Sequence, residues 1–247
     1  MELTQWILGK EDGLLVLEPM TALTDFIVTA VCILGIIKFS RHEKNEKRQL
    51  RVFAWFFLFM GLGTLFAGLF THAFSYVFYP ERLSKEALAA LSYDEKLSYN
   101  LHNLPNWVFN VVSVTLFEVS NVIMIKKYFS KLNTGLYYAV IAVESVTVYA
   151  LLLTVLKYDI AIAHIGFALY LIALPLQIVV YRKFRSEYSK FMIIGILIML
   201  ITPPVMALKF EFCKWFNFND ISHVVIAATM YCFMLAGEKF VKEKVEN

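Results

Sequence analysis

The chain has 247 residues, of which 59% are hydrophobic and only 17% are charged, and its mean hydropathy is +0.63. Soluble globular domains are about one half apolar and about one quarter charged, so this composition excludes an ordinary soluble domain and indicates a polytopic membrane protein. The formal net charge of +3 identifies no partner, and because the basic residues cluster in loops, no nucleic-acid-binding patch is expected.

Seven apolar segments are long enough to be transmembrane helices, each of which needs about 20 apolar residues. Together they use most of the chain and leave no room for a separate soluble domain. Residues 1–247 are therefore expected to form a single all-α domain, a seven-helix bundle integral to the membrane. The predicted spans are roughly 20–39, 52–79, 105–125, 134–156, 159–181, 191–208 and 219–238.

The connecting segments carry local signals of their own. Two apolar runs, 6–8 and 14–17, flank a Gly- and Asp-containing turn and predict a small hairpin or an interfacial segment. No cleavable signal is expected, so the first span is interpreted as an uncleaved anchor. Residues 80–103 place leucines among charges and predict a short amphipathic helix at the outer interface. Pro203 and Pro204 are expected to kink or end the sixth span.

Loops that are rich in Lys and Arg alternate along the chain with loops that are poor in them. Sixteen of the 23 fall in the segments 38–51, 126–131, 182–190 and 239–244, and the remaining seven lie in the N-terminal segment and the intervening loops. The positive-inside rule therefore predicts an N-terminus outside and a C-terminus in the cytoplasm. The three cysteines form no CxxC pair, so neither a redox motif nor a thiolate metal cluster is expected.

Several ionisable residues fall inside the predicted spans, where charge is costly and usually functional. Those expected toward the outer ends of their helices are Asp25, His72, His164, Asp220 and His223. Glu118 lies deeper in the third span and Glu144 near the middle of the fourth. Their arrival from several helices predicts a built pocket that handles a metal or protons. Structural alternatives stay open, since polar groups near span ends can meet headgroups or water and Asp25 can cap its helix.

Helical spacing sharpens this hypothesis. Asn219 and Asp220 precede His223 by about one turn, so all three share one helix surface, and an Asp in that position can orient an imidazole or join it as a ligand. In the second span, small residues including Gly61 and Gly68 form a stripe that ends at His72, and such stripes let helices approach closely.

The order of the spans and two short stretches of sequence resemble a known family. Seven spans, a His late in the second span and an Asn-Asp-x-x-His start to the seventh are similar to the CREST superfamily, which includes alkaline ceramidases and the progestin and adiponectin receptors. The stretches that carry the resemblance are 216–224 and 63–72. It implies a zinc ion held by one His of span two and two of span seven, with a zinc-polarised water attacking a lipid amide.

Residue by residue, His72 and His223 match the pattern that the resemblance implies, and other positions depart from it. Asn219 stands where the family has its other span-seven His, and Gly68 stands where it has a Ser. The third span has no Asp, so Glu118 or an Asn would have to substitute. A standard three-His site is therefore absent unless His164 or Asp220 supplies the missing ligand, and Asp25 is a further candidate for an oxygen ligand.

Two function classes follow. The first is a metal-dependent membrane hydrolase acting on a lipid amide or ester, with zinc ligands His72, His223, Asp220 and His164. In this hypothesis Asp25 or Glu118 acts as the catalytic base. The second is a non-enzymatic seven-helix protein that binds lipid, metal or a partner protein. Membrane lipids are the expected partners in both. Retinal photochemistry is disfavoured because span seven has no lysine before Lys239, and the paired broken helices of a transporter are not indicated.

Overall fold

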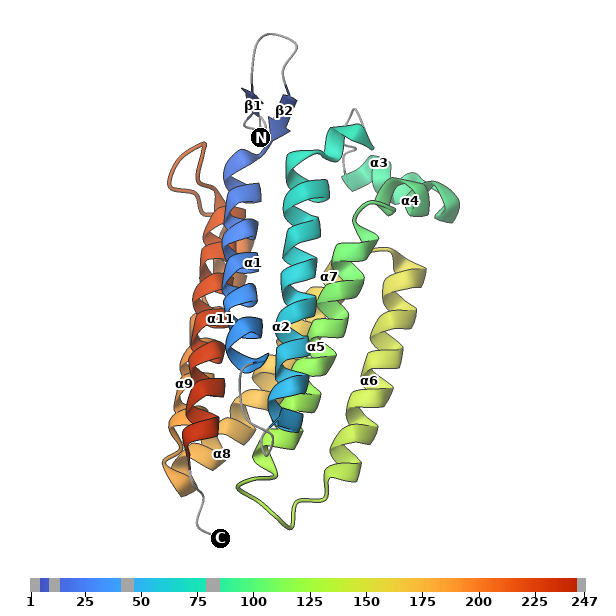
Figure 1. The fold of residues 1–247 in the computed structure, drawn as a ribbon. Helices are drawn as coiled ribbons and strands as arrows, with labels where there is room; N and C mark the ends of the chain where they lie inside the picture. Colours follow the sequence, from blue (N-terminus) through green and yellow to red (C-terminus); the bar gives the residue numbers. More distant parts are fainter. Residues whose placement is uncertain (1–4, 9–13, 41–46, 79–84, 244–247) are drawn as a thin grey trace.

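The computed structural model describes residues 5–8, 14–40, 47–78 and 85–243, and most of them are helical. Seven helices in this part of the chain are long and apolar enough to cross a membrane. They run side by side as a bundle, with a β-hairpin at one end and the last residues of the final helix at the other (Figure 1). We refer to the end that carries the hairpin as the hairpin end.

The prediction of seven apolar helices is confirmed, and most boundaries lie close to the predicted ones. The spans are Pro19–Ser40 (α1), Gln49–Ala73 (α2 with η1), Leu104–Ile125 (α5), Thr134–Val155 (α6), Asp159–Phe184 (α7, η3 and α8), Glu187–Leu208 (α9 and α10) and Phe218–Lys242 (α11). Hydrophobic patterning locates such helices well because every backbone polar group in a membrane must be satisfied within the segment.

The second span is shorter than predicted at its far end. Helix α2 (Lys47–Phe66) continues as a π-helical segment, η1 (Ala67–Ala73), and then stops at Phe74. Residues Ser75–Val77 form a separate 3-10 turn, η2. The prediction of a span up to residue 79 was therefore wrong for residues 74–78, and residue 79 lies outside the described residues. Apolarity continues past the helix end, and hydropathy alone does not report the change in backbone.

Two other spans contain interruptions with identifiable causes. The fifth consists of α7 (Asp159–Gly166), a π-helical segment η3 (Phe167–Ala173) and α8 (Leu174–Phe184). In an α-helix the N–H of residue 175 would donate to the carbonyl of residue 171, but Pro175 has no N–H. The wider π-helical turn before Pro175 keeps its ring from clashing with that carbonyl. The sixth breaks between α9 (Glu187–Met199) and α10 (Thr202–Leu208), beside Pro203 and Pro204. This break confirms the expected kink.

The hairpin end carries the remaining elements. Strands β1 (Gln5–Leu8) and β2 (Leu14–Leu17) pair antiparallel, which confirms the hairpin alternative; the turn between them lies outside the described residues. The amphipathic segment forms two helices, α3 (Lys85–Ala90) and α4 (Tyr93–Asn100), and the expectation of one was wrong. Ser92 starts α4 with a capping box to Glu95, which sets a new helix beginning there.

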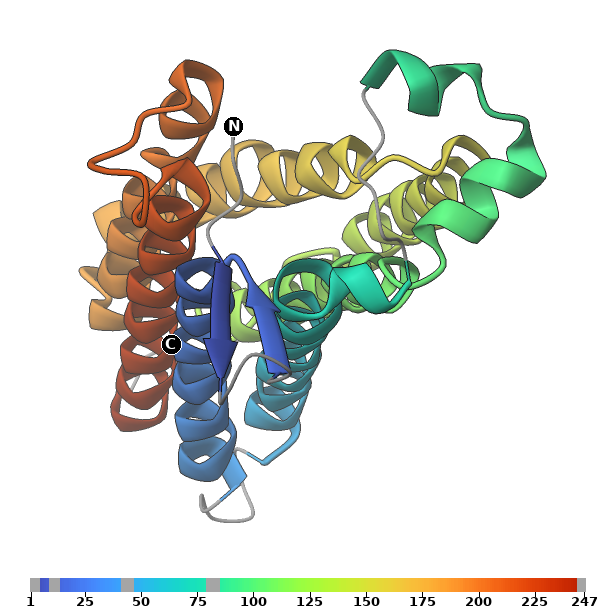
Figure 2. The same ribbon diagram turned by 90° about the horizontal axis from the view of Figure 1, so that it is seen from above.

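Packing gives the bundle an inner and an outer part. Helix α2 packs against α1 and α5, and α11 packs against α9 and α1, around a phenylalanine-rich core. Helix α6 packs mainly against α5 and α7, and its buried residues Ile141, Ser145, Val148 and Leu152 form one narrow stripe. Seen from the hairpin end, the hairpin covers the start of α1, and α6 lies apart from α1 and α11 (Figure 2).

Candidate metal centre

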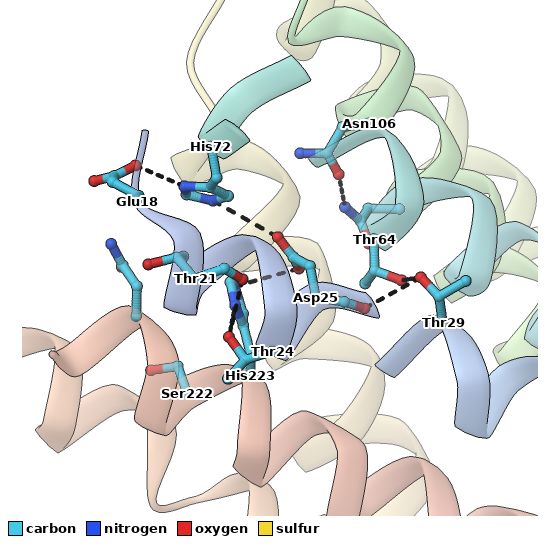
Figure 3. Close-up of polar contacts among 12 residues, drawn as sticks. Glu18, Thr21, Thr24, Asp25, Thr29, Thr64, His72, Asn106, Ser222 and His223 are labelled. Atoms are coloured by element: carbon cyan, nitrogen blue, oxygen red, sulfur yellow. Dashed lines mark hydrogen bonds and ion pairs between the residues drawn. The ribbon is translucent and has the colours of Figure 1, made fainter. Parts of the chain in front are cut away.

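Asp25, His72 and His223 meet near the hairpin end, and we call them the hairpin-end cluster. Asp25 lies in the second turn of α1, His72 in η1, and His223 in the second turn of α11. One ligating atom from each lies within 4.8 Å of those of the other two, and the imidazole ring centroids are 5.8 Å apart. The structure thus brings together the two histidines of the sequence hypothesis, with Asp25 between them (Figure 3).

His72 is oriented by a carboxylate that sequence reasoning missed. Its Nδ1 lies 2.9 Å from Oε2 of Glu18, and its Nε2 lies 3.8 Å from Oδ2 of Asp25. Glu18 is 7% exposed and has a positive φ of 43°. Its carbonyl accepts the first helical bond of α1, from Ala22. The available signal was an acidic residue directly before Pro19, where a helix N-terminus favours negative charge.

His223 is oriented in the same way by Thr24. The Thr24 hydroxyl donates its proton to the Thr21 carbonyl (2.9 Å), so its oxygen is left to accept from Nδ1 of His223, which lies 3.1 Å away. That arrangement places the imidazole proton on Nδ1 and the lone pair on Nε2. This Nε2 lies 3.5 Å from Oδ1 of Asp25.

Asp25 therefore faces Nε2 of both imidazoles. The Glu18 carboxylate only accepts, so a neutral His72 carries its proton on Nδ1 and presents a bare Nε2 to Asp25. Asp25 is 1% exposed, and its Oδ2 has no hydrogen-bond partner among the described residues. With both imidazoles neutral, three acceptors converge without a donor between them among the described residues, and a cation or a shared proton would satisfy them.

Asp220, a ligand in the sequence hypothesis, is engaged in starting α11. Its Oδ2 accepts from the backbone N–H of Asn217 (2.6 Å) in a capping box, and the N–H of Asn219 donates to Oδ1 of Asn217 (2.8 Å). Asp220 lies outside the group of three ligating atoms, but it is near enough for its charge to act on Asp25 and His72. Its Oδ1 is buried without a partner among the described residues.

His164 and Glu118 belong to a different place in the bundle. His164 Nδ1 lies 2.7 Å from Oε1 of Glu144, and one ligating atom from each of Glu118, Glu144 and His164 lies within 4.8 Å of the other two. We call these three residues the mid-bundle cluster, because Glu144 stands halfway along α6. The sequence predicted a single pocket, but the structure divides these residues between two separate clusters.

The field of Asp25 also reaches the loop between α6 and α7. Tyr158 is stacked on Trp107, and the Asn110 amide donates to its hydroxyl at 3.4 Å. Burial raises the pKa of Tyr158 to about 12, and the Asp25 charge adds to this effect. Tyr158 therefore stays protonated near neutral pH, where it can donate a hydrogen bond.

Fold and clusters together define a class of protein: a bundle of seven membrane-length helices with titratable side chains buried between them. The chain belongs to DUF6962, a family of unknown function, which it matches over residues 20–242. No curated protein and no solved structure matches the chain significantly.

Proposed function

We propose that this protein is a metal-dependent membrane hydrolase that acts on a lipid amide or ester at the hairpin-end cluster. The observation that carries the proposal is the orientation of both imidazoles. Glu18 and Thr24 hold the Nδ1 atoms, so the two Nε2 lone pairs face the Asp25 carboxylate. Histidine ligands in metal sites are held in this way, by an oxygen on the nitrogen that does not bind the metal.

The residues present fit zinc. Two imidazole nitrogens and one carboxylate oxygen form a ligand set known from catalytic zinc sites, in which a fourth position holds water. Bound zinc would lower the pKa of that water and polarise a carbonyl group. Asp25, with its unpartnered Oδ2, would supply the third ligand that the CREST resemblance assigns to a histidine at the position of Asn219.

Asp220 is the candidate general base of this proposal. Its Oδ1, which has no hydrogen-bond partner among the described residues, would take a proton from the attacking water and return it to the leaving amine or alcohol as the bond between the carbonyl carbon and that group breaks. Glu118, the other acid considered from sequence, lies in the mid-bundle cluster and has no part in this step. Glu18 and Thr24 keep the ligand nitrogens oriented throughout.

The absence of a serine at position 68 has a steric reason. A Cβ added to Gly68 would lie 2.8 Å from Cε1 of Phe26 and 3.2 Å from Cβ of Asp25. The close approach of η1 to α1 that places His72 beside Asp25 therefore requires glycine. We interpret this as a different solution for the site within a CREST-like arrangement.

The proposal places the hairpin end outside. Basic residues in the last turns of α1, α8 and α11, among them Lys38, Lys183 and Lys239, lie at the opposite end of the bundle, which the positive-inside rule assigns to the cytoplasm. A site close to the outer ends of its helices is accessible to the headgroup region of a membrane lipid, where an amide or ester bond lies.

Zinc content and hydrolysis measured together test the proposal. Gently purified full-length protein should contain near-stoichiometric zinc at the hairpin-end cluster and release fatty acid from ceramide or from an ester lipid in mixed micelles. His223→Ala should lose both properties, while His102→Ala, a histidine outside both clusters, should keep them. If wild-type protein binds no zinc and hydrolyses neither lipid class, the hydrolase proposal is wrong and the binding alternative takes its place.

Orientation is tested with a cysteine that the chain already carries. Cys213 is exposed in the segment between α10 and α11, whereas Cys32 is buried within its span. In cells that hold the protein in the plasma membrane, an impermeant maleimide should label Cys213 without permeabilisation. A Cys213→Ser, Lys190→Cys variant should be labelled only after permeabilisation. The reverse pattern contradicts the proposed orientation.

A further inference from the structure

The mid-bundle cluster joins three helices at a depth where charge is costly. Glu118 comes from α5, Glu144 from α6 and His164 from α7. Glu118 is 1% exposed and His164 is 2% exposed, and the side chain of Glu144 is 15% exposed. Ionisable side chains inside membrane spans are rare and generally face a partner that compensates their charge.

Within the described residues, the polar atoms of this cluster are only partly hydrogen-bonded. Four buried atoms of the cluster have no hydrogen-bond partner there: both carboxylate oxygens of Glu118, Oε2 of Glu144 and Nε2 of His164. Nδ1 of His164 lies 2.7 Å from Oε1 of Glu144, and the carboxyl groups of Glu118 and Glu144 lie near enough to act on each other. With Glu144 ionised, Nδ1 donates and the lone pair of His164 lies on the unpartnered Nε2.

The charge balance then identifies the missing component. If both glutamates are ionised as metal ligands, they and a neutral imidazole carry a net charge of −2, and an isolated charge of that size is strongly disfavoured in a low-dielectric interior. A divalent cation neutralises it completely and at the same time gives a partner to acceptor atoms that lack one.

We propose that Glu118, Glu144 and His164 bind a second divalent cation, separate from the hairpin-end cluster. The proposal does not depend on the hydrolase function. Two carboxylates and one imidazole offer more oxygen than the hairpin-end cluster does, so this site should accept Mn²⁺ more readily, while the nitrogen-rich cluster should favour Zn²⁺.

The cation has a structural consequence for α6. This helix packs mainly against α5 and α7, and these are the two helices that supply the other ligands. Apolar contacts between helices contribute little to their association in a membrane, because lipid tails can make equally apolar contacts with the same side chains. The bound cation ties α6 to its two neighbours through a charged contact that lipid cannot replace.

Metal titration of the full-length protein tests the second site. Chelator-treated protein in detergent is titrated separately with Mn²⁺, followed by electron paramagnetic resonance of free Mn²⁺, and with Zn²⁺, followed by elemental analysis after desalting. Wild type should bind one equivalent of Mn²⁺ with at least 10-fold higher affinity than Glu118→Gln or Glu144→Gln. The control Glu211→Gln, at an exposed glutamate, should match wild type.

The two sites are distinguished by which variant removes which equivalent. His223→Ala should keep the Mn²⁺ equivalent and lose one Zn²⁺ equivalent, whereas Glu118→Gln should lose the Mn²⁺ equivalent and keep the Zn²⁺ equivalent that His223→Ala removes. Protein that binds no Mn²⁺ or Zn²⁺ beyond the equivalent removed by His223→Ala overturns the second site, and so does unchanged binding in both glutamine variants. Thermal unfolding of each metal-free variant checks that its fold is intact. If His223→Ala removes no zinc while Glu118→Gln removes Mn²⁺, the hairpin-end metal fails and the second site stands.

Discussion

The hairpin-end and mid-bundle clusters use the same parts in opposite proportions. The first has two imidazoles and one carboxylate, and the second has two carboxylates and one imidazole. In the first, both imidazoles are held by oxygen atoms that lie outside the cluster, on Glu18 and Thr24. In the second, the imidazole is held by Glu144, which is itself a member. The first cluster is oriented by residues outside it, whereas the imidazole of the second is oriented by one of its own members.

The exposure of the histidines differs between the two clusters. The side chains of His72 and His223 are 14% and 16% exposed, whereas that of His164 is 0% exposed. A metal that exchanges its water for a substrate needs an accessible position, and a metal that only holds helices together does not. This difference is why we assign chemistry to the hairpin-end cluster and cohesion of the bundle to the mid-bundle cluster.

The largest expected effect comes from Asp25→Asn. The amide keeps the size of the side chain but removes the charge that both Nε2 atoms face, so zinc affinity and hydrolysis should fall by more than the roughly 10- to 100-fold that follows loss of a group orienting a ligand. Mn²⁺ binding at the mid-bundle cluster should be unchanged. Isothermal titration with both metals measures this, and an equal loss at both clusters would contradict their independence.

The sequence predicted the helices better than the clusters, for a physical reason. Seven apolar segments report burial in hydrocarbon, which depends on composition along each helix. Which residues meet depends on the rotation and tilt of the helices, and sequence periodicity did not reveal that His164 faces Glu144 on α6 while Asp25 faces α11. The spacing of Asp220 and His223 was correctly noted, but the same spacing serves a capping box, and hydropathy patterns do not separate these roles.

The next effect concerns the orienting residues of the hairpin-end cluster. Glu18→Gln should lower zinc affinity by about 10- to 100-fold, because the carboxylate that fixes the His72 proton becomes a weaker acceptor. Thr24→Val should have a smaller effect, since it removes one neutral hydrogen bond from His223. Zinc competition with a chromogenic chelator gives both values. If Thr24→Val weakened binding more than Glu18→Gln, the charge on Glu18 would not be what orients the site.

Gly68→Ser compares the packing of the two clusters. The new Cβ would lie 2.8 Å from the Phe26 ring, and overpacking of this kind costs about 1–3 kcal/mol of stability. Gly166→Ser is the matched control near His164, because its Cβ would meet nothing closer than Tyr170 at 4.0 Å. Thermal unfolding in detergent should show a lower midpoint for Gly68→Ser, and Phe26→Ala should relieve the difference. Equal midpoints for the two serine variants would contradict the close approach of η1 to α1.

The smallest expected effect is a gain, from Asn219→His. Position 219 lies one turn before His223 on α11, so both side chains share one surface of the helix. The backbone N–H of residue 219 makes the capping contact with Asn217, and the substitution leaves that contact in place. Asp25 already fills the third ligand position, so the added imidazole should tighten zinc by no more than about 10-fold. The gain should disappear in the Asn219→His, His223→Ala double variant, while Mn²⁺ binding stays as in wild type. A gain that survives the loss of His223 would mean that the new histidine binds zinc elsewhere. That result would contradict the assignment of the zinc site to the hairpin-end cluster.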